Sequence, residues 1–381
     1  MKIGVLTLPL VNNYGGILQA YALQSFLRDA GHDVEVIQQI RPARYRSDFS
    51  RLIDKLTFGL RPIKLHNGDI ISRKKWLRLL EEVSSEPKRF INERLRLSEK
   101  LYVEGDLDDV NRLGFDVVVV GSDQVWRRDY VSKIQSYFLD FLDNSQTRKV
   151  AYAASFGTAD WQYDEKVTAE CKNLLKSFKS VSVREKSAVS MCHKYLGMTP
   201  FLAVDPTLLV DPKHYVKLTG AHPKERHLCS YVLDESDMLA AEINRIADDH
   251  SLKIVSPMPK NKFTKVGESK LDDCKFGTVE DWVSAFHQAD YVITDSFHGT
   301  VFSILFNKPF ISYVNRQRGA SRFESLLGEL GLSSRMVYCL EELKSVGLDG
   351  NEIDWTAVNK FLSQWRRKSR DFLIESLRSE C

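Results

Sequence analysis

Four polar segments each follow an apolar run that is typical of a buried β-strand, and the segment TDSFHGT at residues 294–300 carries the strongest chemical signal. His298 would stand at the entry of a helix, where it could act as a general acid or contact a phosphate, and Asp295 could act as a base. The positive end of a helix favours a bound anion and by itself disfavours a protonated histidine. A neighbouring phosphate or carboxylate would push the other way. Gly299 would let a ligand approach the backbone closely.

The segment VSVRE at residues 181–185 ends a predicted strand with an arginine. At the tip of a strand and ahead of a helix, Arg184 would point a forked hydrogen-bond donor into a cleft, which favours binding of an anion. An ion pair with Glu185 or with another acid is the structural alternative.

The segment GSDQVW at residues 121–126 follows the predicted strand at 116–120. Asp123 and Gln124 could bind sugar hydroxyls, and Trp126 could stack on a sugar face. Alternatively, Asp123 caps a helix and Trp126 belongs to the core. The two interpretations stay open on the sequence alone.

The segment NNYGGILQ at residues 12–19 follows the first predicted strand. Paired asparagines and glycines form a tight turn whose backbone N–H groups open onto a cleft at the start of a helix. Many strand–helix turns contain these residues, so the segment does not identify a site by itself. It lacks the G-x-G-x-x-G spacing of a dinucleotide site, and we expect neither NAD nor FAD.

The elements that position these segments alternate between apolar runs and helix-period stretches, which is typical of parallel sheets with crossover helices. Such sheets bind ligands outside the carboxyl ends of their strands, where all four segments lie. Strands are predicted at residues 2–8, 33–38, 116–120, 149–154, 180–183, 201–204, 227–233, 252–255, 290–293 and 310–314. Helices are predicted at residues 17–30, 164–178, 185–195, 236–250, 279–288, 299–306, 321–330 and 356–379.

We therefore expect an α/β protein with two Rossmann-like domains that face a central cleft, spanning residues 1–207 and 208–355. Residues 356–381 predict a helix that could cross back onto the first domain. Residues 41–100 are basic, helical in composition and poor in strand signals, and we interpret them as an insertion or lid of helices and loops. A solvated surface is the usual role of such a segment, and contact with an anionic ligand or a membrane face is the alternative.

Composition excludes several classes of protein. The 54 lysine and arginine residues nearly balance the 51 aspartate and glutamate residues, which gives no case for a dedicated nucleic-acid binder. The six cysteines are scattered without a C-x-x-C pair, which argues against a zinc site or a disulfide framework and fits a reducing compartment. The first apolar run ends at Asn12 and indicates a buried strand rather than a signal peptide. No apolar stretch approaches the roughly 18–20 residues needed to cross a bilayer. We expect a cytoplasmic protein that holds no metal.

Seven motifs, taken in order along the chain, resemble those of the bacterial polysaccharide pyruvyl transferase family. They are NYGGILQAYALQ (13–24), GSDQVW (121–126), AASFG (153–157), VSVRE (181–185), DPTLL (205–209), TDSFHGT (294–300) and SRFESLL (321–327). Together they extend over nearly the whole chain except residues 41–100. Several matched motifs in the same order are far more specific than any one of them.

The resemblance implies a GT-B-like pair of domains in which phosphoenolpyruvate is the donor and a sugar with two suitably placed hydroxyls accepts a cyclic pyruvate ketal. It implies no cofactor beyond phosphoenolpyruvate as co-substrate. The expected acceptor is a bacterial cell-surface polysaccharide or its lipid-linked precursor. Peripheral contact of the basic segment with the inner membrane face stays the alternative to a solvated surface. The catalytic candidates are His298, Asp123 and Asp295. The donor-binding candidates, in the second domain except for Arg184, are Arg184, Ser296, His298, Gly299, Thr300, Arg318 and Arg322. The acceptor-binding candidates are Asn13, Tyr14, Gly15, Gln19, Asp123, Gln124 and Trp126.

The chain departs from the family pattern at one position, because Ser296 stands where better-studied members have an arginine. A buried anion needs several cationic or N–H partners, so another guanidinium should replace it. Arg316, Arg318 and Arg322 follow the next predicted strand, and Arg322, which opens a helix, is our preferred candidate; ordinary surface charges are the alternative. A nucleotide-sugar glycosyltransferase on the same scaffold and a non-catalytic homologue are the rival functions.

Overall fold

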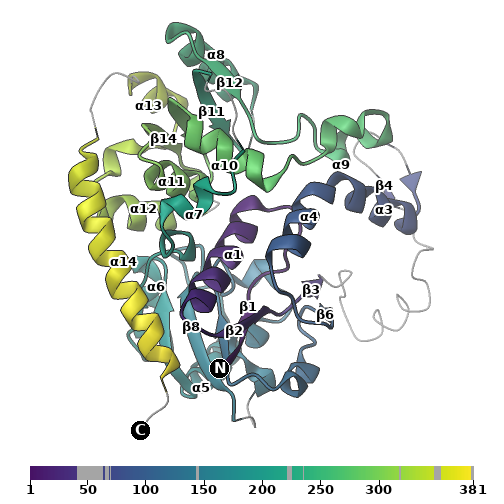
Figure 1. Ribbon diagram of the computed structural model, residues 1–381, viewed down its shortest axis with the longest axis vertical. Coiled ribbons are helices and arrows are strands. Elements are labelled where there is room, and N and C mark those ends of the chain that lie inside the picture. Colours follow the sequence, from purple (N-terminus) through teal and green to yellow (C-terminus); the bar gives the residue numbers. More distant parts are fainter. Residues whose placement is uncertain are drawn as a thin grey trace.

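The computed structural model describes residues 1–40, 63–64, 68, 70–142, 146–220, 225–234, 236–316, 319–346 and 353–378. Two parallel β-sheets with helices packed around them form two α/β domains, one above the other in Figure 1. The predicted class, two Rossmann-like domains, is therefore confirmed. We call them the N-terminal and C-terminal domains, and the boundary expected after residue 207 falls between the two sheets.

The sheet of the N-terminal domain has six strands in the order β10-β9-β8-β7-β1-β2, and every pair is parallel. Its strands are β1 (Lys2–Leu6), β2 (Asp33–Val36), β7 (Val117–Val120), β8 (Arg148–Ala154), β9 (Phe178–Val183) and β10 (Phe201–Leu202). The four valines of β7 are all buried, as expected for a strand covered on both faces. After β1 the chain adds β2 on one side and β7 on the other. This reversal leaves a crevice outside the carboxyl ends of β1 and β7.

The sheet of the C-terminal domain repeats this arrangement with five parallel strands in the order β12-β11-β13-β14-β15. They are β11 (His227–Tyr231), β12 (Lys253–Val255), β13 (Tyr291–Thr294), β14 (Phe310–Tyr313) and β15 (Met336–Val337). Here the reversal lies between β11 and β13. The TDSFHGT segment begins at the last residue of β13 and therefore lies at the crevice of this sheet.

The remaining elements are short strands and helices. Small sheets pair β3 (Gln39–Ile40) with β6 (Tyr102–Val103) and β4 (Ile63–Lys64) with β5 (Ile70–Ile71). The helices are α1 (Tyr14–Asp29), α3 (Arg73–Val83), α4 (Ser85–Arg94), α5 (Glu165–Leu175), α6 (Lys186–Met191), α7 (Pro212–Val216), α8 (Asp237–Asp249), α9 (Phe263–Val266), α10 (Val279–Gln288), α11 (Phe297–Leu305), α12 (Ala320–Glu329), α13 (Leu340–Ser345) and α14 (Trp355–Leu377).

The two domains meet where α1 follows β1 and α11 follows β13. Tyr14 is buried at this contact, stacks on Trp282 with ring centroids 5.9 Å apart, and donates a hydrogen bond from its hydroxyl to the Gly277 carbonyl at 2.8 Å. Both α1 and α11 begin two or three residues earlier than the sequence predicts. The glycines and polar residues of these segments that we expected in loops therefore form first helical turns.

The C-terminal helix α14 crosses back onto the N-terminal domain, as predicted, and runs along one side of the molecule in Figure 1. The indole nitrogen of Trp365 donates to the Leu202 carbonyl at 3.0 Å, and the Ser369 hydroxyl accepts from the Val204 amide at 3.1 Å. Leu373 is fully buried against the same domain. The helix thus fastens the two domains together.

The described part of the insertion, α3 and α4, is not a free-standing lid. The Phe276 amide donates to the carbonyl of Val83 at 2.8 Å, and Arg89 forms an ion pair with Glu280 at 3.0 Å. Both helices therefore bridge from the N-terminal domain to the C-terminal domain. Residues 41–62, 65–67 and 69 of the expected insertion lie outside the described residues.

We predict that Leu373→Ala lowers the free energy of unfolding by about 2–5 kcal/mol, because it leaves a cavity under a helix that joins both domains. Urea denaturation monitored by circular dichroism measures the change. Phe361→Ala on the same helix is the matched control, since Phe361 is 41% exposed and its loss should cost far less. Equal effects of the two substitutions would contradict the packing of α14.

Candidate active site

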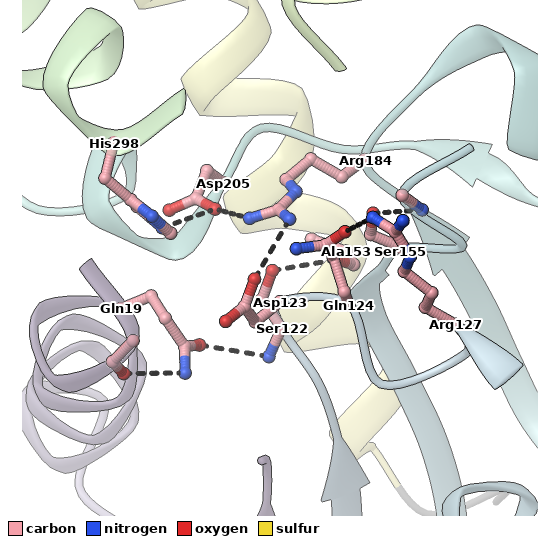
Figure 2. Close-up of polar contacts among 12 residues, drawn as sticks. Gln19, Ser122, Asp123, Gln124, Arg127, Ala153, Ser155, Arg184, Asp205 and His298 are labelled. Atoms are coloured by element: carbon pink, nitrogen blue, oxygen red, sulfur yellow. Dashed lines mark hydrogen bonds and ion pairs between the residues drawn. The ribbon is translucent and has the colours of Figure 1, made fainter. Parts of the chain in front are cut away.

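A buried network of charged side chains joins three strand ends of the N-terminal domain (Figure 2). Arg184 follows β9, and its Nη1 atom donates to Asp205 Oδ2 at 2.5 Å while Nη2 donates to Asp123 Oδ1 at 3.3 Å. Asp123 follows β7, and Asp205 follows β10 after two residues. All three side chains are almost completely buried. The ion-pair alternative for Arg184 is therefore confirmed, with Asp205 and Asp123 rather than Glu185 as partners, and its anion-binding role stays a prediction.

The backbone between β7 and Asp123 explains how the acid reaches this position. Gly121 has a φ of 118°, and a Cβ atom there would lie 2.2 Å from the Tyr152 carbonyl oxygen, so only glycine fits. Ser122 donates from its hydroxyl to the Ala153 carbonyl at 2.8 Å and from its amide to Gln19 Oε1 at 3.1 Å. Asp123 itself has a φ of 71°. The tight turn aims its carboxylate at Arg184.

His298 brings the C-terminal domain to this network. It lies in the first turn of α11, and its Nε2 atom is 3.7 Å from Asp205 Oδ2, a charge contact rather than a hydrogen bond. Within the described residues, this buried nitrogen has no hydrogen-bond partner. The other side of the imidazole lies against α1, where a Cβ atom on Gly15 would stand 2.2 Å from Nδ1. Gly15 is therefore required for the two domains to close around the histidine.

A second guanidinium, that of Arg322, enters the site from the start of α12. Its side chain is buried, and its Cζ atom lies 5.4 Å from the centre of the Phe297 ring. The Cζ atom of Arg184 lies 4.5 Å from the centre of the same ring. Two cations from different domains thus share one aromatic neighbour beside His298. Our preferred candidate among the three arginines lies inside the site.

Burial and charge act in opposite directions on these groups. Burial by itself raises the pKa of the Asp205 carboxyl, but His298 and Arg184 outweigh it and hold the pKa well below its ordinary value. Burial alone would lower the pKa of the Arg184 guanidinium, whereas Asp205 and Asp123 raise it. Burial first, and then the charge of Arg184, lower the pKa of Arg322 from 12.5 to about 10. Arg322 is therefore still a cation at neutral pH, but it is held beside a like charge.

A polar cavity of about 240 Å³ opens at the carboxyl ends of β1 and β7. Its lining residues are Thr7, Leu8, Pro9, Leu10, Val11, Asn12, Asn13, Gly16, Gln19 and Asp123. This cavity brings together three of the predicted acceptor-side residues. The Asn13 side chain is exposed, whereas Gln19 is fully buried and donates to Thr7 Oγ1 and the Gly16 carbonyl, both at 2.9 Å.

Two aromatic candidates do not face the cavity. Trp126 has no exposed surface; its ring stacks on Phe138 at 4.8 Å and its indole nitrogen donates to the Tyr137 carbonyl. It is a core residue, and the idea that it stacks on a sugar is wrong. Tyr14 packs between the domains, as described above, and cannot contact an acceptor either.

Several candidates around His298 have structural partners instead of an open side facing a ligand. The Asp295 carboxylate accepts hydrogen bonds from the Leu233 and Asp234 amides at 2.7 and 2.8 Å, so it fastens the end of β11 and is poorly placed as a base. Thr300 is fully buried and its hydroxyl pairs with Ser312. At Gly299 a Cβ atom would strike Thr294 Oγ1 at 2.3 Å. The glycine accommodates this packing rather than a ligand.

The other predicted donor-side residues divide in the same way. The Ser296 hydroxyl caps α11 by accepting from the Gly299 amide at 3.4 Å. Arg316 is exposed and lies over the Tyr338 ring at 4.3 Å, and Arg318 lies outside the described residues. On the acceptor side, Gln124 is buried and its Oε1 atom accepts from Arg127 at 2.9 Å.

Three residues of the site were not singled out from the sequence. Asp205 was interpreted only as part of a turn, although an acid directly after the predicted strand at 201–204 is a signal of the same kind as Asp123 after the strand at 116–120. The Glu185 carboxylate accepts from the Ser155 hydroxyl at 3.0 Å and from the Phe156 and Gly157 amides at 2.9 and 3.2 Å. Burial raises its pKa. No sequence signal distinguishes Phe297, whose ring is buried against both guanidinium groups.

Within the part of the chain that the structure describes, no cluster of His, Cys, Asp and Glu side chains could hold a metal ion. None of the described helices is both long and apolar enough to cross a membrane.

The fold is similar to that of two-domain proteins of the GT-B type. UDP-GlcNAc 2-epimerase from Neisseria meningitidis, in a structure with UDP-GlcNAc, is 9% identical and superimposes with a TM-score of 0.50 over 99% of each chain. An Arabidopsis thaliana protein complexed with UDP-L-rhamnose is 10% identical, with a TM-score of 0.53 over 98% of each chain. At these identities the likeness concerns the fold alone.

The family is settled by sequence. The family model described as polysaccharide pyruvyl transferase matches residues 13–317, which is most of the chain, and the protein belongs to this family. No curated protein has significant sequence similarity to it. The matched region contains Asp123, Arg184, Asp205 and His298, and it ends before Arg322.

We predict that Gly15→Ala lowers the free energy of unfolding by about 1–3 kcal/mol, because the added methyl group would overlap the His298 ring. Gly16→Ala is the matched control on the same helix, since its methyl group would meet the movable end of the exposed Asn13 side chain at 3.2 Å. Chemical denaturation of both variants measures the difference. If Gly15→Ala is as stable as the control, α1 and the histidine are not in contact.

We predict that Asp205→Asn destabilises the protein by about 3–5 kcal/mol at pH 7, because it leaves Arg184 buried without its closest counter-charge. The folded-state pKa of Asp205 lies below its unfolded value of about 3.9, so the unfolded chain binds the proton first. Its contribution to stability is thus fully present above about pH 4 and is lost as the pH falls towards the folded-state pKa.

Denaturation curves between pH 7 and pH 3 measure this dependence. Stability of the wild-type protein should fall towards acid pH more steeply than that of Asp205→Asn. Asp129→Asn, which changes an exposed acid, should follow the wild-type curve. Parallel curves for the wild-type protein and Asp205→Asn would contradict the assigned role of the buried carboxylate.

Proposed function

We propose that the protein transfers the pyruvyl group of phosphoenolpyruvate to two hydroxyls of one sugar and forms a cyclic ketal. The acceptor would be a bacterial cell-surface polysaccharide or its lipid-linked precursor. Membership of the polysaccharide pyruvyl transferase family supports the class of reaction. The observation that carries the choice of donor is the pair of buried guanidinium groups, Arg184 and Arg322, beside His298.

This pair is suited to a small, highly charged anion. Arg322 is buried next to Arg184, and the mutual repulsion contributes to its lowered pKa. An anion bound between them would relieve this repulsion and gain charge-assisted hydrogen bonds from a forked donor. The Nε atom of Arg184 and the Nε2 atom of His298 are both buried without a hydrogen-bond partner within the described residues. Phosphate and carboxylate oxygens are the acceptors that such groups require.

Arg322 also offers an answer to the serine at position 296. The Ser296 hydroxyl caps α11 and carries no charge, so it can offer a ligand a hydrogen bond but cannot replace a guanidinium. A cation supplied from the start of α12 can approach the same region from the neighbouring strand–helix unit, because β13 and β14 lie side by side. The missing arginine is thus compatible with retained use of phosphoenolpyruvate.

The reaction needs one general acid and one base. A protonated His298 gives its proton to the methylene carbon of phosphoenolpyruvate, and the adjacent carbon becomes electrophilic. One sugar hydroxyl adds to that carbon and loses its proton. The C–O bond to phosphate then breaks, and the phosphate takes the bonding electron pair. The second hydroxyl adds to the resulting oxocarbenium ion and loses its proton, which closes the ketal ring. Of the two hydroxyl protons, one restores the acid and the other leaves with phosphate.

Asp123 is the better placed of the two candidate bases. It lines the polar cavity with Asn12 and Asn13, whereas Asp295 is held by two backbone amides. A sugar in this cavity would have its hydroxyls near a carboxylate that Arg184 also holds. Asp205 touches His298 and Arg184 and would position both rather than react.

The proposal is tested by release of inorganic phosphate from phosphoenolpyruvate in the presence of glycan acceptors, with mass spectrometry of the product. We predict that His298→Ala lowers turnover roughly 100-fold or more, the usual scale for losing a general acid. Arg322→Ala should raise the dissociation constant for phosphoenolpyruvate roughly tenfold to a hundredfold, since a hydrogen bond to a charged group contributes about 1.5–3 kcal/mol. Arg316→Ala is the matched control, because Arg316 lies on the surface over Tyr338, and it should leave both values unchanged.

Two other outcomes would contradict the proposed transfer of pyruvate from phosphoenolpyruvate. Release of a nucleoside diphosphate from a sugar nucleotide, without use of phosphoenolpyruvate, would make the protein a glycosyltransferase on a shared scaffold. Failure of phosphoenolpyruvate to raise the melting temperature of the wild-type protein would show that it does not bind the native state.

A further inference from the structure

An apolar cavity of about 450 Å³ lies between β2, β3 and the two insertion helices α3 and α4. Its walls include Val36 and Ile37 from the sheet side and Leu80 and Ile91 from the helices. The volume is within the range of about 300–1,000 Å³ that is usual for small-molecule sites. It belongs neither to the charged network nor to the polar cavity of the candidate active site.

Exposed apolar side chains gather around this cavity. Val11, Ile40, Leu77 and Leu101 all line it, although they are 51%, 47%, 43% and 51% exposed. Soluble proteins normally expose such side chains singly, and a cluster of them at a cavity indicates a place where an apolar group binds. They come from four separate segments, so no single local feature of the chain accounts for the cluster.

The apolar cavity adjoins the polar cavity of the site. Both are bordered by the same stretch of chain after β1, since Thr7, Leu8, Leu10 and Val11 line each of them. Asp123 lines the polar cavity but not the apolar cavity. One molecule could therefore occupy both, with a polar end near Asp123 and an apolar end under α3 and α4.

Two polar atoms in the apolar cavity restrict what can bind. The Gln39 side chain is buried; its Nε2 atom donates to the Thr7 carbonyl at 2.7 Å, whereas Oε1 has no hydrogen-bond partner within the described residues. The buried hydroxyl of Ser84 is in the same situation. A purely aliphatic ligand would leave both unsatisfied, which is costly. A free sugar would leave the apolar walls unused. A chain that carries hydroxyl groups at one end satisfies both.

On these grounds we propose that the apolar cavity binds an aliphatic chain attached to the acceptor glycan, with the sugar reaching the polar cavity at Asp123. This inference rests on the proposed function for the identity of the glycan as acceptor. The acceptor is then a glycolipid, and the insertion helices, which the sequence suggested as a lid, form part of its binding site.

Isothermal titration calorimetry with methyl and n-octyl β-D-galactopyranoside, below the micelle concentration and without phosphoenolpyruvate, tests the proposal. Each buried methylene group increases the affinity by a factor of roughly four. The octyl glycoside should therefore bind at least about tenfold more tightly than the methyl glycoside, even if only part of the chain is buried. The double variant Leu77→Gln, Leu101→Gln should reduce this difference to less than about threefold, because polar groups then line the cavity. Both positions are exposed, so the fold should persist.

Met238→Gln is the matched control. Met238 is 69% exposed on α8 of the other domain and does not line the cavity. It should keep the full difference between the two glycosides. The proposal is overturned if the octyl glycoside does not bind, if it binds no better than the methyl glycoside, or if the double variant keeps the difference.

The donor plays no part in this measurement, so the two proposals can fail separately. Pyruvyl transfer to short glycosides with no dependence on chain length would support the proposed function and overturn the glycolipid site. Binding that depends on alkyl chain length, in a protein that does not use phosphoenolpyruvate, would support the glycolipid site. It would overturn the assignment of phosphoenolpyruvate as the donor.

Discussion

The burial of the Arg184 guanidinium constrains the whole N-terminal half of the site. A buried charge is tolerated only when counter-charges and hydrogen bonds replace its hydration. Asp205 and Asp123 supply them, and each comes from a different strand end, at 2.5 and 3.3 Å. The ends of β7, β9 and β10 must therefore keep their register. The glycine at position 121 follows from the same requirement, because the turn that delivers Asp123 leaves no room for a Cβ atom.

The network becomes a candidate catalytic site only where the second domain meets it. His298 lies between Asp205 and the start of α1, and Gly15 permits this approach. Gly319 makes a similar contact, since a Cβ atom there would lie 2.0 Å from the Gly157 carbonyl oxygen. The crossing helix α14 holds the domains together and contacts Val204, the residue next to Asp205. His298 and the guanidinium groups of Arg184 and Arg322 thus come together through the contact between the domains. Neither domain alone brings all three together.

Much of the fold and the centre of the site could be predicted from the sequence. Strand ends are visible as changes from apolar to polar residues, and this rule indicated Asp123, Arg184 and His298. It could not indicate which polar residues turn inward to serve the fold. Asp295 and Thr300 follow the same strand as His298 but are engaged by backbone amides and by Ser312. The rule was also insufficient for Trp126, because the residue that buries its ring, Phe138, lies outside the motif.

Under the proposed function, Arg322 would supply a charge that the family pattern places at position 296. The pKa of its guanidinium is lowered to about 10, because burial and Arg184 both oppose its charge. Asp123 and Glu185 act in the opposite direction, and a bound anion would offset the remaining electrostatic penalty further. The start of α11 cannot supply this charge, because the residue at position 296 is an uncharged serine. The start of α12 can, since β14 places it beside β13 and both helices then point at one crevice. Under the proposed function, the electrostatic demand of a donor anion would thus be met by geometry between elements, which a motif read along a single segment cannot reveal.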